Sequence, residues 1–389
     1  VFSIRCGNQV DFVATISRHN NGPSHLRCLA GTSIFKQWGQ CMKRLSKKQR
    51  EKLLRRQRTL LRSRVRISQK SNPRGSKSRK DQTTRPDSLR LAAPVVFDIE
   101  DNKNRRSLID FLEELRGHFK HHPEKRLLID FQGTQRFVAA GTLLFYAELC
   151  RLIDYSPTTQ VRCSEPRNER ARQALQQIGV YGICHHTCRG KPTHRDVVHW
   201  RVARGHMVDA SQYAETIEAH EGRLAEPLVK GIYRGLAEAM TNVCHHAYIR
   251  RREDGLDHDG PSDWWVFSQA KDGHLFVALC DLGAGIPVTL PKTNPSMFSR
   301  LKARIGVKPL DGECISAAVE DSRSRTGKRE RGKGLGDIIR AVSSAPRGRA
   351  VVFSNRGFYT LNAGKESSGN YRDSILGTLI SWSVPIQAG

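Results

Sequence analysis

The hydrophobic pattern of the chain changes at Pro94, where short apolar runs begin to alternate with amphipathic stretches. Apolar runs of about five residues suit buried strands, and apolar residues three or four apart suit helices with one packed face. Strands alternating with helices of this length predict a small α/β layer domain. The expected elements are strands at 95–99, 127–131 and 160–163, and helices at 108–119, 139–153 and 168–178.

A second α/β region is predicted in the C-terminal half. A helix beginning near Glu226 carries an apolar stripe through Leu228, Ile232 and Leu236, which marks its core-facing side. The other elements expected are a hairpin of strands at 264–269 and 274–280, a helix at 337–342 and a last strand in GTLISWSVPI.

These patterns predict an α/β (α+β) protein with four segments. They are a basic, largely disordered segment at 1–93, an α/β domain at 94–184, a connector at 185–222 and a second α/β domain at 223–389. The linker composition of residues 68–93, rich in Ser, Pro, Gly, Lys and Arg, supports the first boundary.

The positive charge is concentrated in the N-terminal segment. Between Met42 and Arg90 there are 19 Lys and Arg residues against three acids, which supplies +16 of the formal net charge of +27. Two interpretations stay open for residues 42–93: a solvated disordered tail, or an arm that binds nucleic acid through phosphate attraction. Residues 1–41 either belong to the native chain or precede a natural start at Met42, the first methionine.

The ten cysteines are scattered, unlike the dense pattern of a small secreted disulfide scaffold. No run approaches the length of a membrane span, and no signal peptide is recognisable. We therefore expect a soluble, cytoplasmic protein that does not bind membranes. Cys184, Cys188, His194 and His199 could supply four zinc ligands, but ordinary buried thiols and surface histidines explain the same residues.

The helix near Glu226 also carries three polar residues at i, i+4 and i+8. Glu238, Asn242 and His246 are expected to lie along one face of it. An amide oxygen is a suitable ligand for Mg²⁺ where a phosphate supplies the remaining charge. A carboxylate one turn away can act as a general base.

Two glycine-containing segments follow this helix. Asp281, Gly283 and Gly285 come directly after the second strand of the hairpin, where a carboxylate can accept a hydrogen bond from an adenine amino group. The segment RGKGLG at 331–336 opens an apolar helix, and free N–H groups at such a start attract phosphate.

The three segments in this order resemble the N, G1 and G2 boxes of the Bergerat (GHKL) ATPase superfamily. The segment AEAMTNVCHHAY is most similar to the anti-sigma-factor serine kinase branch. The resemblance implies that Glu238 is the catalytic base, that Asn242 binds Mg²⁺ and that the cofactor is ATP. The residues implied to hold ATP are Asn242, His246, Asp281, Gly283, Gly285, Gly332, Lys333, Gly334, Gly336 and Thr378.

The stretch between the two glycine segments, 288–331, would form an ATP lid with a helix at 314–321. Such lids close over substrate and exclude water. Arg325, Lys328, Arg331 and Lys333 are candidates for contact with the γ-phosphate, although a solvated basic loop explains each of them equally well.

In the first α/β domain, LLIDFQGTQRFVAAGTLLFYAEL and the ending ARQALQQIGV resemble a STAS (anti-sigma-factor antagonist) domain. Gly141 matches the glycine that follows the regulatory phospho-serine of that family. The serine position falls on Ala140, so the usual acceptor is missing, and Thr142 is a weak substitute. The resemblance implies a protein-binding domain with an altered switch.

Together these features predict a Mg-ATP-binding regulator that hydrolyses ATP or transfers its γ-phosphate to a Ser or Thr of a regulatory protein partner. The alternative is a nucleic-acid-associated GHKL ATPase of the gyrase, MutL or MORC kind that uses the basic arm. A non-catalytic, ATP-gated adaptor is a third interpretation. The sequence leaves the oligomeric state open, with a homodimer among the alternatives.

Overall fold

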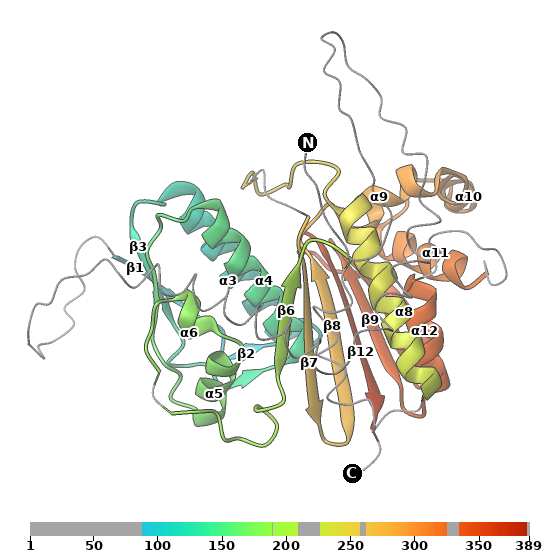
Figure 1. The fold of residues 1–389 in the computed structure, drawn as a ribbon. Helices are drawn as coiled ribbons and strands as arrows, with labels where there is room; N and C mark the ends of the chain where they lie inside the picture. The colour runs from blue at the N-terminus through green and yellow to red at the C-terminus, as the bar shows by residue number, and fades with distance from the viewer. Residues whose placement is uncertain (1–87, 189, 209–225, 257–261, 325–333, 387–389) are drawn as a thin grey trace, which may run out of the picture. The chain divides into compact units, whose positions relative to one another are not determined.

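The computed structural model of the protein describes residues 88–188, 190–208, 226–256, 262–324 and 334–386. The predicted mixed α/β fold is confirmed: helices pack against both parallel and antiparallel sheets (Figure 1). The basic segment that the sequence predicts to be disordered lies, up to residue 87, outside the described residues.

The first α/β region is built on a three-stranded parallel sheet in the order β1-β3-β5, with a second short pairing of β2 with β4. Its strands are β1 (Ser88–Ala92), β2 (Val96–Phe97), β3 (Arg126–Asp130), β4 (Arg136–Phe137) and β5 (Val161–Cys163). Its helices are α3 (Asn102–His121), α4 (Ala139–Tyr155), α5 (Glu169–Gln177) and α6 (Val180–Ile183).

Two of these helices begin where a side chain satisfies the first backbone N–H groups. Asp101 accepts from the N–H of Asn104 at 3.0 Å, and Asn168 accepts from that of Ala171 at 3.0 Å. Helix α4 starts differently, because its N-cap residue, Val138, makes no side-chain hydrogen bond.

The second region is built on a seven-stranded sheet in the order β11-β10-β9-β12-β8-β7-β6, in which all the neighbours are antiparallel. Its strands are β6 (Arg201–Gly205), β7 (Trp264–Lys271), β8 (His274–Asp281), β9 (Arg349–Ser354), β10 (Gly357–Asn362), β11 (Lys365–Asn370) and β12 (Thr378–Pro385). Its helices are α8 (Glu226–Asn242), α9 (Ile286–Thr293), α10 (Pro295–Ile305), α11 (Asp311–Ser324) and α12 (Gly334–Ser344), with a π-helical turn at Val243–Ala247 after α8.

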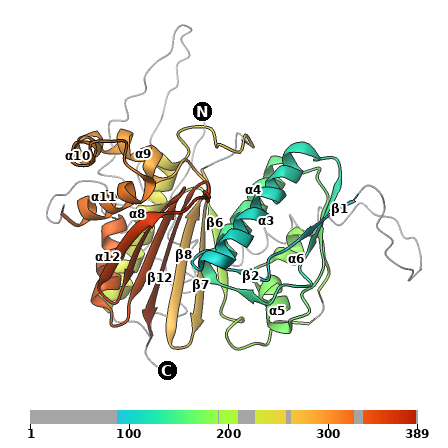
Figure 2. The ribbon, with the colours of Figure 1, turned by 180° about the vertical axis from the view of Figure 1, so that it is seen from behind.

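Both faces of this sheet are buried along its central strands β7, β8, β12 and β9, whose alternate residues point to the two faces. Val266, Leu279 and Ile380 face α8 and α12, whereas Phe267 and Cys280 join the core of the first region. Helix α4 packs on that second face against β7, β8 and β12 (Figures 1 and 2). The apolar runs of β7 and β8 are therefore continuous because neither face is left to solvent.

Helices α8 and α12 approach each other closely through two glycines of α8. A Cβ added at Gly231 would lie 2.7 Å from the Cβ of Ala341, and one added at Gly235 would overlap the Cγ1 of Ile338. The absence of side chains at these positions lets the two helices pack together on the sheet.

Two strands lie where the sequence predicts loops. Ser88–Ala92, at the end of the predicted linker, pairs in parallel with β3, and Arg201–Gly205, in the predicted connector, forms the edge strand β6. Neither has an apolar run, and each is held by backbone pairing with a neighbouring strand, β3 or β7. Among the described helices, none combines the length and apolar character that crossing a bilayer requires.

Candidate functional site

A cavity of about 400 Å³ opens between α8, the ends of β8 and β12, and the helices α9 to α11. Five residues that the sequence predicts to bind ATP line it: Asn242, His246, Asp281, Gly285 and Thr378. Apolar side chains complete much of the wall, namely Val243, Ala247, Leu279, Ile286, Leu290, Met297, Leu335 and Ile380. A volume of this size suits a small-molecule ligand.

Asp281 lies at the base of the cavity, where β8 ends beside β12. It is 5% exposed, and its Oδ1 accepts a hydrogen bond from the N–H of Gly283 at 2.9 Å. Burial raises the pKa of Asp281 to about 6, although the hydrogen bonds from Gly283 and Thr378 and the charge of Arg252 act in the opposite direction. A buried carboxylate that is only partly compensated by the protein is suited to a ligand that donates a hydrogen bond.

The loop after Asp281 passes directly under the π-helical turn. The N–H of Ala284 donates to the carbonyl of Ala247 at 2.6 Å, and a Cβ at Gly283 would overlap that same carbonyl oxygen. Gly285 has a φ of +82°, a conformation that residues with a side chain rarely adopt. The glycines of this loop therefore allow the backbone to run between the helix end and the cavity.

The sequence predicts that Asn242 and His246 lie on one continuous α-helix, but the structure shows that they do not. Helix α8 ends at Asn242, and His246 belongs to the wider π-helical turn Val243–Ala247. Both still line the cavity, and the Asn242 side chain makes no capping hydrogen bond to the turn. Such π-helical turns recur at functional sites because they redirect side chains within a helix.

Glu238 lies outside the cavity wall, one turn before Asn242 on α8. It sits against the first residue of α12, because a Cβ added at Gly334 would overlap the Cβ and Cγ of Glu238. A Cβ at Gly336 would likewise lie 2.7 Å from the Oγ of Ser322 in α11. Gly332, Lys333, Arg325, Lys328 and Arg331 are outside the described residues.

The lid helices contribute polar residues that the sequence analysis missed. The cavity is lined on this side by Asp321 and Ser322 of α11, by Thr289 and Thr293 of α9, and by Asn294, which follows α9. The amide of Asn294 donates to Asp321 at 2.8 Å. The predicted lid helix at 314–321 is thus part of the longer α11 (Asp311–Ser324), whose polar residues Asp321 and Ser322 were the available signal for ligand contacts.

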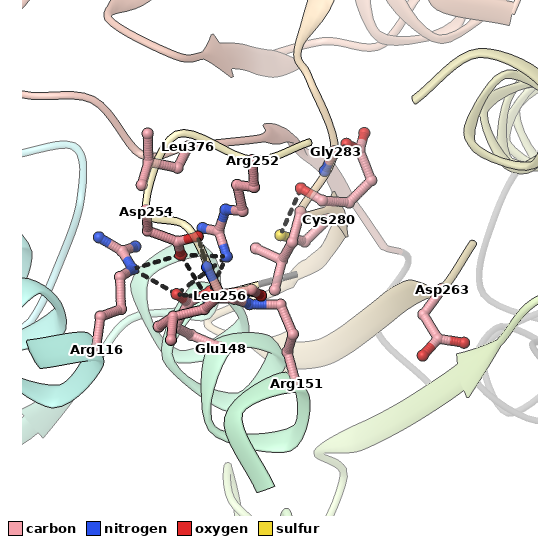
Figure 3. A network of polar contacts seen from close by, with 12 residues as sticks. Arg116, Glu148, Arg151, Arg252, Asp254, Leu256, Asp263, Cys280, Gly283 and Leu376 are labelled. Carbon is pink, nitrogen blue, oxygen red and sulfur yellow. Dashed lines mark hydrogen bonds and ion pairs between the residues drawn. The ribbon is translucent and has the colours of Figure 1, made fainter. Parts of the chain in front are cut away.

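A buried charge network adjoins the site (Figure 3), and one of its members, Arg252, is close enough for its charge to act on Asp281. Glu148 of α4 pairs with Arg116 of α3, with Arg151 at 2.9 Å and with Arg252 at 2.9 Å, and Arg151 pairs with Asp254 at 2.6 Å. Burial alone would raise the pKa of Glu148, but the three guanidinium groups hold it well below its usual value. The segment after the π-helical turn therefore contacts both the site and the first α/β region.

Tyr248, directly after the π-helical turn, is hydrogen-bonded to the loop that follows Asp281. Its hydroxyl accepts from the N–H of Leu282 at 3.2 Å and donates to the carbonyl of Asp263 at 2.7 Å. The chain from Ala247 to Asp254 thus leads from the cavity wall, past Tyr248, to the charge network.

The four candidate zinc ligands do not come together. Within the described ranges, no group of three or more His, Cys, Asp and Glu side chains is arranged to hold a metal ion. Cys184 is fully buried, and the Sγ of Cys188 accepts from Arg172 at 3.1 Å. His194 instead pairs with Asp196 at 2.6 Å.

The residues at the predicted phosphorylation position are enclosed. Ala140 and Thr142 are buried at the start of α4, and the Thr142 hydroxyl donates to the carbonyl of Val138 at 2.7 Å. A Cβ at Gly141 would lie 2.6 Å from the carbonyl oxygen of Phe97, which accounts for the glycine by packing. Thr142 therefore offers no accessible hydroxyl.

Comparison of the sequence with protein-family models and with curated proteins gave no match. The interpretation of the cavity rests on its own residues and geometry.

Proposed function

We propose that the cavity binds Mg-ATP and that the protein is an ATP-dependent regulator of the GHKL kind. The observation that carries the proposal is the convergence of α8, the Asp281–Gly285 loop and Thr378 on one cavity of about 400 Å³. These segments are far apart in the sequence, and the sequence predicts a part in nucleotide binding for each of them.

The base of the cavity suits the adenine. In this proposal the ionised Asp281 accepts a hydrogen bond from the exocyclic amino group, and the apolar side chains Val243, Leu279 and Ile380 contact the ring. Thr378 supports the carboxylate, because its hydroxyl and N–H both hydrogen-bond to Asp281. Specificity for adenine would arise because guanine presents a carbonyl oxygen to the buried carboxylate.

The other end suits the phosphates and the metal ion. Asn242 lines the cavity with an amide oxygen, a hard donor that fits Mg²⁺. Gly334 begins the 11-residue helix α12, whose first N–H groups and dipole favour negative charge. Asp321 on the lid side offers a carboxylate oxygen as a further, water-mediated metal contact.

Glu238 is proposed to act as the general base at this phosphate end. Its side chain lies against Gly334, at the start of α12. From there it would take a proton from a water molecule or from a Ser or Thr hydroxyl of a partner. Hydrolysis and phosphoryl transfer share this requirement, so the proposal includes both outcomes.

The regulatory part of the proposal rests on the charge network. Arg252 and Asp254 follow the π-helical turn and pair with Glu148 and Arg151 of α4. A change in the cavity that moves this segment would alter its ion pairs with the STAS-like region. We propose that this region binds the regulatory protein partner.

The test follows the γ-phosphate. The full chain is incubated with γ-labelled ATP and Mg²⁺, alone, with a cell extract and with DNA or RNA, and the label is traced. We expect Mg-dependent ATP binding, with the label released as phosphate or transferred to a protein Ser or Thr. Turnover that requires nucleic acid would favour the alternative ATPase, in which the basic residues 42–93 bind the polyanion. Failure to bind Mg-ATP in a calorimetric titration would refute both versions.

A further inference from the structure

A second cavity, of about 260 Å³, lies on the opposite face of the seven-stranded sheet, between that sheet and the start of α4. Strand β12 contributes to both cavities through alternate residues. Thr378 and Ile380 face the proposed nucleotide site, whereas Ser381 and Ser383 are the polar residues it presents to the second cavity. The two sites are therefore separated by the thickness of the sheet.

The floor of the second cavity is a row of neighbouring residues on four strands. In the strand register, Arg349 of β9 is opposite Ser383 of β12, Ser383 is opposite Phe276 of β8, and Phe276 is opposite Gln269 of β7. The row thus offers a guanidinium, a hydroxyl, an aromatic ring and an amide, all among the residues that line the cavity.

Three of the lining side chains are polar, more than nine-tenths buried and without a partner. Gln269 is 5% exposed, Ser381 7% and Ser383 8%. Throughout the described part of the chain, no hydrogen bond reaches the side chain of any of the three. Buried polar groups are nearly always hydrogen-bonded, so side chains that face a cavity in this state indicate a ligand or ordered water.

The roof is the start of α4, which has no side-chain cap. The first hydrogen bond within the helix runs from the N–H of Thr142 to the carbonyl of Val138, at 2.9 Å. Ala139 and Ala140 line the cavity, and their N–H groups come before this first bond, so the helix itself supplies no acceptor for them. They add the positive end of the helix dipole to the wall.

The charges around the cavity indicate a singly charged anion. The cavity is lined by three basic residues, Arg136, Lys271 and Arg349, and by two acidic residues, Asp98 and Glu100. The formal charge of these five side chains is therefore +1. Arg349 already pairs with Glu100, and Arg136 lies 3.7 Å from Asp98. A dianion would bring excess negative charge beside the buried Asp98 and the partly buried Glu100, whereas one carboxylate balances the wall.

We propose that this second cavity binds a small monocarboxylate, whose oxygens accept from the start of α4 and from Ser383, and whose remaining atoms contact Phe276 and Gln269. The ligand would touch both α4 and the seven-stranded sheet, and it would stabilise their packing by binding only the folded arrangement. The proposal goes beyond Mg-ATP binding and does not depend on it.

The test is equilibrium dialysis of the full chain against radiolabelled propionate, without nucleotide, at an ionic strength that screens the basic residues. The neutral, nearly isosteric propionamide serves as the matched ligand. We expect about one propionate per chain, and no retention of propionamide, because an amide cannot accept charge-assisted hydrogen bonds at both of its ends.

Two variants alter opposite walls. Ala139→Pro removes one N–H at the first helical position, where proline is tolerated, and Val138 is already extended, with φ −109° and ψ 138°. Ser383→Ala removes the floor hydroxyl. Each should weaken propionate binding about tenfold, while the exposed control Ser344→Ala leaves it unchanged. Circular dichroism and thermal unfolding establish which variants are folded. One folded wall variant is enough to test the proposal.

Three results would overturn the proposal. One is the absence of retained propionate. Another is equal retention of propionamide. The third is retention that neither wall variant reduces, which would assign the binding to surface lysines and arginines that every variant keeps.

Discussion

Arg252 and Glu148 are 104 residues apart in the sequence, yet the Nη1 of Arg252 lies 2.9 Å from the Oε2 of Glu148. Glu148 is fully buried on α4, and Arg252 follows the π-helical turn that forms one wall of the nucleotide cavity. This ion pair connects the two α/β regions, and the charge of the same Arg252 acts on Asp281. Its consequences for stability can be measured separately from those for nucleotide binding.

We predict that Glu148→Gln strongly destabilises the protein. The substitution would leave the buried Arg116, Arg151 and Arg252 without the carboxylate that all three contact, while Asp254 still pairs with each of them. Removing one partner of a buried ion-pair network reduces stability by about 3–5 kcal/mol. Urea unfolding, monitored by tryptophan fluorescence, measures the change in the free energy of unfolding.

The matched control is Glu113→Gln on the exposed side of α3, which should change the free energy of unfolding by less than about 0.5 kcal/mol. Equal stability of the two variants would show that the buried network does not hold the regions together.

A second prediction concerns the pH dependence of stability at Asp281. The pKa of this carboxyl is about 6 in the folded protein, above the value of about 3.9 in an unfolded chain. Between these values the folded state holds a proton that unfolding releases. The contribution of Asp281 to stability is therefore greatest below about pH 4, falls as the pH rises through 6, and changes by about 3 kcal/mol in total.

The variant Asp281→Asn does not titrate, so the difference between its pH profile and that of the wild type isolates this group. We expect the wild type to lose stability relative to Asp281→Asn between pH 4 and 7.5. The same variant should lose adenine nucleotide binding, since the amide donates where the carboxylate accepts. Parallel stability profiles would contradict the raised pKa.

A third prediction separates metal binding from chemistry. Asn242→Ala should lose the part of ATP affinity that depends on Mg²⁺, because it removes the amide oxygen from the cavity wall. Glu238→Gln should retain Mg-ATP binding and lose turnover by about 100-fold or more, the range expected for loss of a general base.

Calorimetric titrations with and without EDTA measure the first effect, and steady-state release of labelled phosphate measures the second. The exposed Asn362→Ala is the control for substitution of an asparagine. Equal turnover in the wild type and in Glu238→Gln would assign the base to another residue.

A fourth prediction compares two glycines inside helices. Gly235→Ala should destabilise the protein by about 1–3 kcal/mol, because the new methyl group overlaps Ile338 of α12. Gly117→Ala, in α3, meets nothing within 4 Å and should stabilise by about 0.5–1 kcal/mol. Thermal unfolding of both variants checks the pair. Stabilisation by Gly235→Ala would mean that α8 and α12 pack less closely than described.

The sequence predicted the elements whose hydrophobic period is strong. Helix α8 begins at Glu226 as expected from its apolar stripe, and the hairpin of β7 and β8 lies within a residue or two of the expected ranges. Strands β1 and β6 were missed, because Ser88–Ala92 and Arg201–Gly205 lack an apolar run and are held by pairing with β3 and β7. Their stability comes from neighbours that are distant along the chain.

Some residues of the candidate site could likewise be predicted from the sequence, and others could not. Asn242 and Asp281 were identifiable because their residue types stand near the end of a helix and of a strand, whereas Thr378 was identified only through the resemblance to the GHKL superfamily. The π-helical turn that carries His246, and the lid residues Asn294 and Asp321, were not identifiable, since their positions depend on how α9 and α11 pack.

By itself, the sequence determined that the chain alternates strands and helices and that a carboxylate, an amide and glycines occur at their ends, because these are properties of short segments. Only the tertiary structure decided that the first region covers the second face of the large sheet, with Glu148 buried against Arg252 and a cavity left at the start of α4. The physical reason is that burial and charge pairing depend on which surfaces meet, and such contacts join residues that no local pattern connects.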